Sequence, residues 1–145
     1  MKIIYTVIIA FLILELLNVI ILYFSPSTKK GNGLGVFNAY EKAKRDPEIS
    51  ALVDYLVNWV AGTKLIFIAL LIVILFTGND TTIIYSVIAL VPTISSFYWR
   101  LYPAIKEMAR KGQINPTSYS NTLAIMIAFF LGMFVCALTF YYGSK

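Results

Sequence analysis

The chain has no histidine and only one cysteine, Cys136. These absences exclude metal sites built from Cys and His, Ser-His-Asp and Cys-His nucleophile pairs, and an internal disulfide. Acidic residues are also few, seven in 145, and most lie in or beside the polar connections. The sequence therefore predicts no metal site and no cofactor. The sequence favours a protein without enzymatic activity, and an enzyme remains the alternative.

Charged residues make up only 13% of the chain against 59% hydrophobic residues, and the mean hydropathy is +0.79. A helix needs about 20 residues to span the hydrocarbon core of a bilayer. Four apolar runs are long enough, at about 3–24, 56–76, 82–101 and 119–142. We predict a single all-α, multi-pass integral membrane domain over residues 1–145. The first run exceeds the apolar core of a signal peptide, so we expect a retained span, with a cleaved signal as the alternative.

Basic residues gather in the first and third connections, and the second connection has none. They are Lys29, Lys30, Lys42, Lys44 and Arg45 in the first, and Arg100, Lys106, Arg110 and Lys111 in the third. Because short cytoplasmic loops accumulate Lys and Arg, both termini are expected to face away from the cytoplasm. The net charge of +5 then reflects topology and attraction to anionic membrane lipids, and no fold signal supports nucleic-acid binding.

Each of these two basic connections is expected to contain a short helix on the membrane surface. In the first, residues 36–45 have apolar residues on one side and cations on the other. Asp46-Pro47-Glu48 then has the cap, proline and acid typical of a helix start. In the third, residues 104–111 lie between Pro103 and Gly112, which indicates a second short helix.

The first connection also carries a glycine segment, residues 31–35, directly after two lysines. One interpretation is a flexible basic linker. The other is contact with a lipid headgroup or phosphate, with backbone N–H groups cradling the anion. The residues proposed for that contact are Lys29, Lys30, Gly31, Gly33, Gly35 and Arg100.

The fourth run contains a small residue at every fourth position. The ladder is Ser120, Ala124, Ala128, Gly132 and Cys136. Small residues allow helix backbones to approach closely in lipid. We therefore predict a helix-packing face, either within the chain or as an oligomer seam.

The third run has small or polar residues along one side, interrupted by a proline. The seam is Thr82, Ser86, Ala89, Thr93, Ser96 and Arg100. Pro92 leaves the carbonyl of Ile88 without its helical donor, and the hydroxyl of Thr93 or Ser96 is expected to replace it, directly or through water. The seam indicates either a kinked packing helix or a hydrated polar lining.

Two ionisable residues lie deep in the apolar runs. Glu15 is twelve residues from Ile3 and Lys64 is twelve from Phe76, about 18 Å of helix in each case. An isolated charge at that depth is expensive, so we predict that the two pair. The predicted intramembrane polar site comprises Glu15, Asn18, Asn58, Lys64, Thr93 and Ser96. If it is dry, the pair fixes helix packing; if it is hydrated, Glu15 is the first candidate for function.

Three functions remain open. The first is transport or channel-like activity coupled to a proton or cation at Glu15, in a homo-oligomer because four helices make a thin wall. A carboxylate in the first of four short spans is similar to the small multidrug resistance transporters, although the first loop is far longer here and Lys64 has no counterpart. The second is a non-catalytic subunit, immunity or assembly factor that binds a partner membrane protein. The third is a lipid-acting enzyme that uses Glu48, Asp54, Lys106 and Arg110 at the interface.

Overall fold

The computed structural model describes residues 1–143, and these residues form helices and connections without a strand. The elements are α1 (Lys2–Phe24), η1 (Leu34–Val36), α2 (Asn38–Ala43), α3 (Pro47–Thr77), α4 (Asp80–Arg110) and α5 (Tyr119–Gly143). Four of them, α1, α3, α4 and α5, are long and apolar enough to cross a membrane. The all-α architecture and the four long apolar helices are confirmed.

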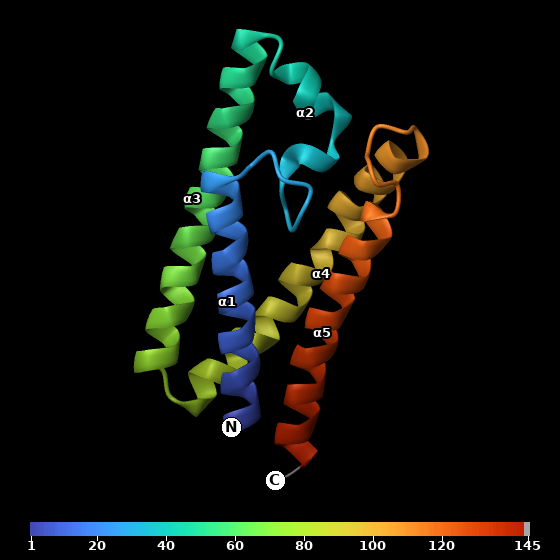
Figure 1. The fold of residues 1–145 in the computed structure, drawn as a ribbon. Coiled ribbons are helices and arrows are strands. Elements are labelled where there is room, and N and C mark those ends of the chain that lie inside the picture. The colour runs from blue at the N-terminus through green and yellow to red at the C-terminus, as the bar shows by residue number, and fades with distance from the viewer. Residues whose placement is uncertain (144–145) are drawn as a thin grey trace.

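The four long helices form two antiparallel pairs, α1 with α3 and α4 with α5 (Figure 1). The pairs are inclined to each other, and α1 bridges them by packing on α5 as well. Consecutive helices α3 and α4 have little contact, although the short turn between them predicts adjacent packing. The start of α1 and the end of α5 lie at one end of the molecule, opposite the two longer connections (Figure 1).

Aromatic rings hold the centre of the bundle together. The ring of Phe11 on α1 makes edge contacts with Phe67 on α3 and with Phe130 and Phe134 on α5, at centroid separations of 6.2, 5.5 and 5.4 Å. Edge-to-face packing at such distances is favourable beyond the area it buries. Phe11 therefore positions α1 between α3 and α5, four residues before Glu15 on the same helix.

The predicted start of α3 is confirmed in detail. The carboxylate of Asp46 accepts hydrogen bonds from the backbone N–H groups of Glu48 and Ile49 at 3.0 and 3.2 Å, and Pro47 opens the helix. These bonds satisfy two of the amide groups that a helix leaves without a partner in its first turn. The helix then continues without interruption to Thr77.

The predicted separate helix at residues 104–111 is wrong, because α4 continues through Pro92 and Pro103 to Arg110. A proline removes one amide donor and leaves the rest of the helical hydrogen-bond ladder in place. Beyond Pro103, Ile105 is buried in a small core formed by the connections, and this packing holds the last turns in line. A helix is present in the first connection but is shorter than expected, as α2, and its place on the membrane surface stays a prediction.

The two longer connections pack on each other and form a cap across the helix pairs. Val36, Ile105, Ile114 and Leu123 make a second buried cluster. The N–H of Asn115 donates to the carbonyl of Val36 at 2.8 Å, and the side chain of Asn38 donates to the carbonyl of Gly112 at 2.9 Å. The connections therefore tie the pair α1 and α3 to the pair α4 and α5.

Candidate functional site

Glu15 on α1 and Lys64 on α3 form a direct ion pair, in which the ammonium group donates a hydrogen bond to the carboxylate. The predicted pairing is confirmed. The Lys64 side chain remains 26% exposed and that of Glu15 18% exposed. The two charges neutralise each other, but they are not sealed inside the bundle.

The ion pair lies on a shallow pocket of about 250 Å³ at the junction of α1, α3 and α4. Its lining residues are Phe11, Glu15, Thr63, Lys64, Phe67, Leu90, Thr93 and Ile94. The hydroxyls of Thr63 and Thr93 donate to the carbonyls of Trp59 and Ala89 on their own helices, so neither donates to Glu15. Apart from the ion pair, the walls are therefore mainly apolar.

Three of the six residues predicted for this site lie away from the pocket. The side-chain amide of Asn58 donates to the carbonyl of Asp54 at 2.9 Å, and the Ser96 hydroxyl donates to the carbonyl of Thr93 at 2.6 Å. Asn18 lies nearer the loop end, where its side-chain oxygen is next to Gly31. Of the predicted residues, the structure places only Glu15, Lys64 and Thr93 on this pocket.

Thr93 is the member of the polar seam of α4 that reaches the pocket of the ion pair, whereas Ser96 and Arg100 line another pocket beside Trp99. Thr93 lines the pocket shared with α1 and α3, whereas Ile88 and Val91 face α5. Residues of the seam repeat at intervals of three and four, which keeps them on one side of the helix. Except for Ser86, which is half-buried, its members are exposed.

A direct replacement by a hydroxyl for the donor lost at Pro92 is wrong, and a replacement through water stays a prediction. Thr93 donates to the carbonyl of Ala89, Ser96 to that of Thr93 and Ser95 to that of Val91 at 2.7 Å. None of these hydroxyls bonds the carbonyl of Ile88. A hydroxyl reaches most easily the carbonyl three or four positions earlier, and Ile88 lies five positions before Thr93 and eight before Ser96.

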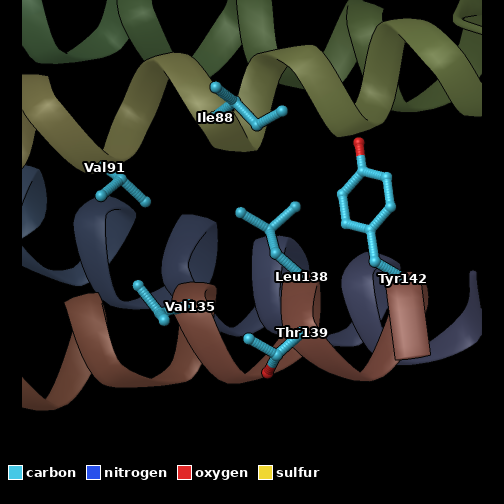
Figure 2. Close-up of a pocket in the computed structure, with 6 residues that line it drawn as sticks. All are labelled: Ile88, Val91, Val135, Leu138, Thr139 and Tyr142. Carbon is cyan, nitrogen blue, oxygen red and sulfur yellow. The ribbon is translucent and has the colours of Figure 1, made fainter.

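A second pocket, of about 300 Å³, lies between α4 and α5 and is almost wholly apolar (Figure 2). It is lined by Ile88, Val91, Val135, Leu138, Thr139 and Tyr142. The ring of Tyr142 extends from α5 toward α4 (Figure 2), and the hydroxyl of Thr139 donates to the carbonyl of Cys136 at 2.9 Å. Tyr142 is the one ionisable residue in the lining, and the other lining residues fit a hydrocarbon neighbour.

The small-residue ladder of α5 does not pack on another helix of the chain along most of its length. Ser120 is buried and Ala124 half-buried, but Ala128, Gly132 and Cys136 are exposed. The buried side of α5 consists of Leu123, Phe130, Phe134 and Ala137 together with Ser120. The intramolecular interpretation is therefore wrong for the second half of the ladder, and the oligomer seam remains a prediction.

The glycines of the first connection serve close backbone packing. The N–H groups of Gly33 and Gly35 donate to the carbonyls of Lys30 and Thr28 at 3.1 and 3.0 Å. These two amides are therefore engaged and do not form the expected phosphate cradle. A Cβ at Gly35 would lie 2.0 Å from the carbonyl oxygen of Ser27, so the turn requires glycine at this position.

The residues predicted to contact a lipid headgroup lie in different parts of the structure. Lys29 and Gly35 line a polar pocket on the first connection, whereas Arg100 lies on the outer face of α4 beside Trp99. Sequence reasoning missed that Lys42 and Arg45 join Lys29 there. The sequence does contain a pattern that indicates this cluster. One helix face is expected to carry Asn38, Glu41, Lys42 and Arg45, because of their spacing. Headgroup contact itself remains a prediction.

The acids and cations suggested for lipid chemistry do not converge in the described part of the chain. Arg110 pairs with Glu107 within α4 at 2.7 Å, and no ion pair joins Glu48 or Asp54 of α3 to Lys106 or Arg110. Residues 1–143 also contain no group of three acidic or cysteine side chains placed to hold a metal ion. No protein-family model, curated protein or solved structure matches the chain.

Proposed function

We propose that this chain is a membrane-embedded, non-catalytic subunit or assembly factor that works against a second copy or another membrane protein. The observation that carries the proposal is the position of the Glu15–Lys64 pair. The pair faces a side pocket between α3 and α4 and keeps part of both side chains exposed. In a bilayer, hydrocarbon is a poor neighbour for ionised groups, so a helix of another chain is the favoured cover.

The polar seam of α4 supports the same surface. Thr93 shares the pocket with the ion pair, and Ser96 and Arg100, three and seven residues further along α4, line another pocket beside Trp99. The seam hydroxyls are satisfied by carbonyls of their own helix, so they can lie against a neighbouring helix without leaving orphaned donors. We call the pocket at the junction of α1, α3 and α4, which is lined by Glu15, Lys64 and Thr93 among others, the lateral groove.

Photo-crosslinking in native membranes tests this proposal for any protein partner. A photoreactive amino acid would replace Thr93 in the lateral groove, and in a control it would replace Ile66, an exposed apolar residue on the opposite side of α3 from Lys64. We expect a protein adduct from position 93 and only lipid adducts from position 66. Lipid adducts alone from both positions would contradict an assembled lateral groove.

A second candidate is transport of a proton or cation at Glu15, favoured by the partial exposure of the ion pair on its pocket. In this case the neighbouring chain would complete a pathway that leads to Glu15. Wild-type protein in liposomes would then move protons or a cationic solute, and Glu15→Gln would abolish the flux while the protein stayed folded. Equal flux in wild type and Glu15→Gln would reject this candidate and leave the subunit role in place.

A further inference from the structure

The first connection contains a polar pocket of about 380 Å³, separate from the lateral groove. Its lining residues are Ser27, Lys29, Gly35, Phe37, Asn38, Glu41, Lys42 and Arg45. The volume is in the range of sites that hold small ligands. The pocket lies on the connection between α1 and α3, at the end of the molecule opposite the start of α1 and the end of α5 (Figure 1).

Two segments build the pocket. Asn38, Glu41, Lys42 and Arg45 share one face of α2 and the turn that follows it. Lys29 comes from the preceding turn, which the hydrogen bond from the N–H of Gly35 to the carbonyl of Thr28 closes at 3.0 Å.

The wall of the pocket is anchored to the rest of the molecule. Phe37 is bridged to Ile114 of the third connection, and its ring lies 6.1 Å from that of Tyr119 on α5. The neighbouring Asn38 donates its side-chain amide to the carbonyl of Gly112. These contacts hold the residues that line the pocket in place before any ligand arrives.

The charge on this pocket is positive and not neutralised by the described part of the chain. No carboxylate of residues 1–143 pairs with Lys29, Lys42 or Arg45. The one acid in the lining, Glu41, is bound instead by Lys44 at 2.8 Å, which raises the pKa of Lys44 above its ordinary value. Three cations therefore line one concave site, and none of them has an ion-pair partner in residues 1–143.

We infer that this pocket binds a phosphate ester of net negative charge, with Arg45, Lys42 and Lys29 as the binding residues. A guanidinium group matches the oxygens of a phosphate in a two-pronged arrangement, and two ammonium groups add point charges. The structure offers side chains for this role, rather than the backbone amides that the glycine segment suggests. A phospholipid headgroup is one source of such an ester, and a free phosphorylated metabolite is the other.

Native mass spectrometry of the purified full-length protein tests this inference. The protein in detergent micelles would be incubated with dioleoyl phosphatidylglycerol, dioleoyl phosphatidylcholine or glycerol 3-phosphate. We expect one phosphatidylglycerol or one glycerol 3-phosphate to bind per chain in preference to phosphatidylcholine. If only phosphatidylglycerol binds, the source is a lipid; if glycerol 3-phosphate binds and displaces it, the source is a soluble ester.

Matched charge variants separate the pocket from general electrostatic attraction. Each basic residue near an anionic surface contributes roughly a factor of five, so Lys29→Gln, Lys42→Gln and Arg45→Gln together should weaken binding roughly a hundredfold. The control variant combines Lys106→Gln, Arg110→Gln and Lys111→Gln, exposed cations outside the pocket lining whose substitution removes the same charge, and it should bind like wild type. Equal loss in both variants, or equal binding of phosphatidylcholine, would overturn the inference.

A charge-preserving variant tests whether a loss of phosphate binding is caused by misfolding. Lys29, Lys42 and Arg45 are all exposed, so changing them removes no core packing. A variant with Lys29→Arg and Lys42→Arg keeps every charge and should retain binding. Loss of binding in this variant while its fold is intact would also count against a site that recognises phosphate by charge.

Discussion

Lys64 donates a hydrogen bond to the carboxylate of Glu15 across 49 positions of sequence, joining α3 to α1. Each residue lies within a helix long and apolar enough to cross a membrane. Removing one partner leaves the other charge without its counterion, whereas removing both leaves only apolar and neutral groups. The relationship therefore predicts an asymmetry between single and double substitutions.

Glu15→Gln and Lys64→Met are each expected to destabilise the protein by about 2 kcal/mol, below the usual cost of orphaning a fully buried charge. The double variant should recover most of that loss, because no unpaired charge remains. Thermal unfolding of the four proteins in the same detergent measures the cycle. Additive losses in the double variant would show that the two residues do not stabilise the fold through each other.

The turn at Gly35 gives a second prediction. In Gly35→Ala the new Cβ would lie 2.0 Å from the carbonyl oxygen of Ser27, so the backbone of the turn must move. We expect a lower unfolding temperature and weaker phosphate binding in the adjacent pocket. Gly132→Ala is the matched control, since no atom lies within 4 Å of the added Cβ. In the helix interior it should be neutral or stabilising by up to about 1 kcal/mol. Similar losses in both variants would contradict the steric explanation.

Sequence patterns specified the local elements and the ion pair because these depend on composition and spacing. Apolar run length gave the four long helices, the Asp46 cap gave the start of α3, and depth counting brought Glu15 and Lys64 to the same level. Each of these three predictions depends on the sequence of one helix or on a comparison of two helix lengths. None of them requires knowledge of which helix faces are buried.

Two features of the fold depend on tertiary packing, which the sequence patterns do not specify: the length of α4 and the buried side of α5. Burial of Ile105 in the core of the connections keeps α4 continuous past Pro103, which local proline chemistry argues against. Phe130 and Phe134 bury their own side of α5, and the ladder at Gly132 and Cys136 therefore faces outward. In lipid both large and small residues make good packing faces, so periodicity alone does not say which one the bundle uses.

Tyr98 provides a test of the contact between α4 and α5. Its hydroxyl donates to the carbonyl of Ala124 at 2.6 Å, a bond between two helices. Tyr98→Phe should destabilise the protein by about 1 kcal/mol, the typical net contribution of one such hydrogen bond. Tyr85→Phe is the control, because Tyr85 is 66% exposed and no bond to its hydroxyl is seen in the described structure. The measurement is thermal unfolding, and an equal effect of both substitutions would count against the inter-helix bond.

A substitution in the exposed part of the α5 ladder can distinguish assembly of several chains from folding of a single chain. Gly132→Leu adds a large side chain where the single chain has open space, so the monomer should keep its unfolding temperature. A neighbouring helix packed on the small residues would be pushed away, because close approach depends on the absence of bulk. We expect the assembled species to decrease on size-exclusion chromatography with light scattering. Ala69→Leu, which enlarges an exposed alanine on α3, is the control and should leave assembly unchanged. An unaltered mass for Gly132→Leu would exclude the ladder as a seam and leave the lateral groove as the assembly surface.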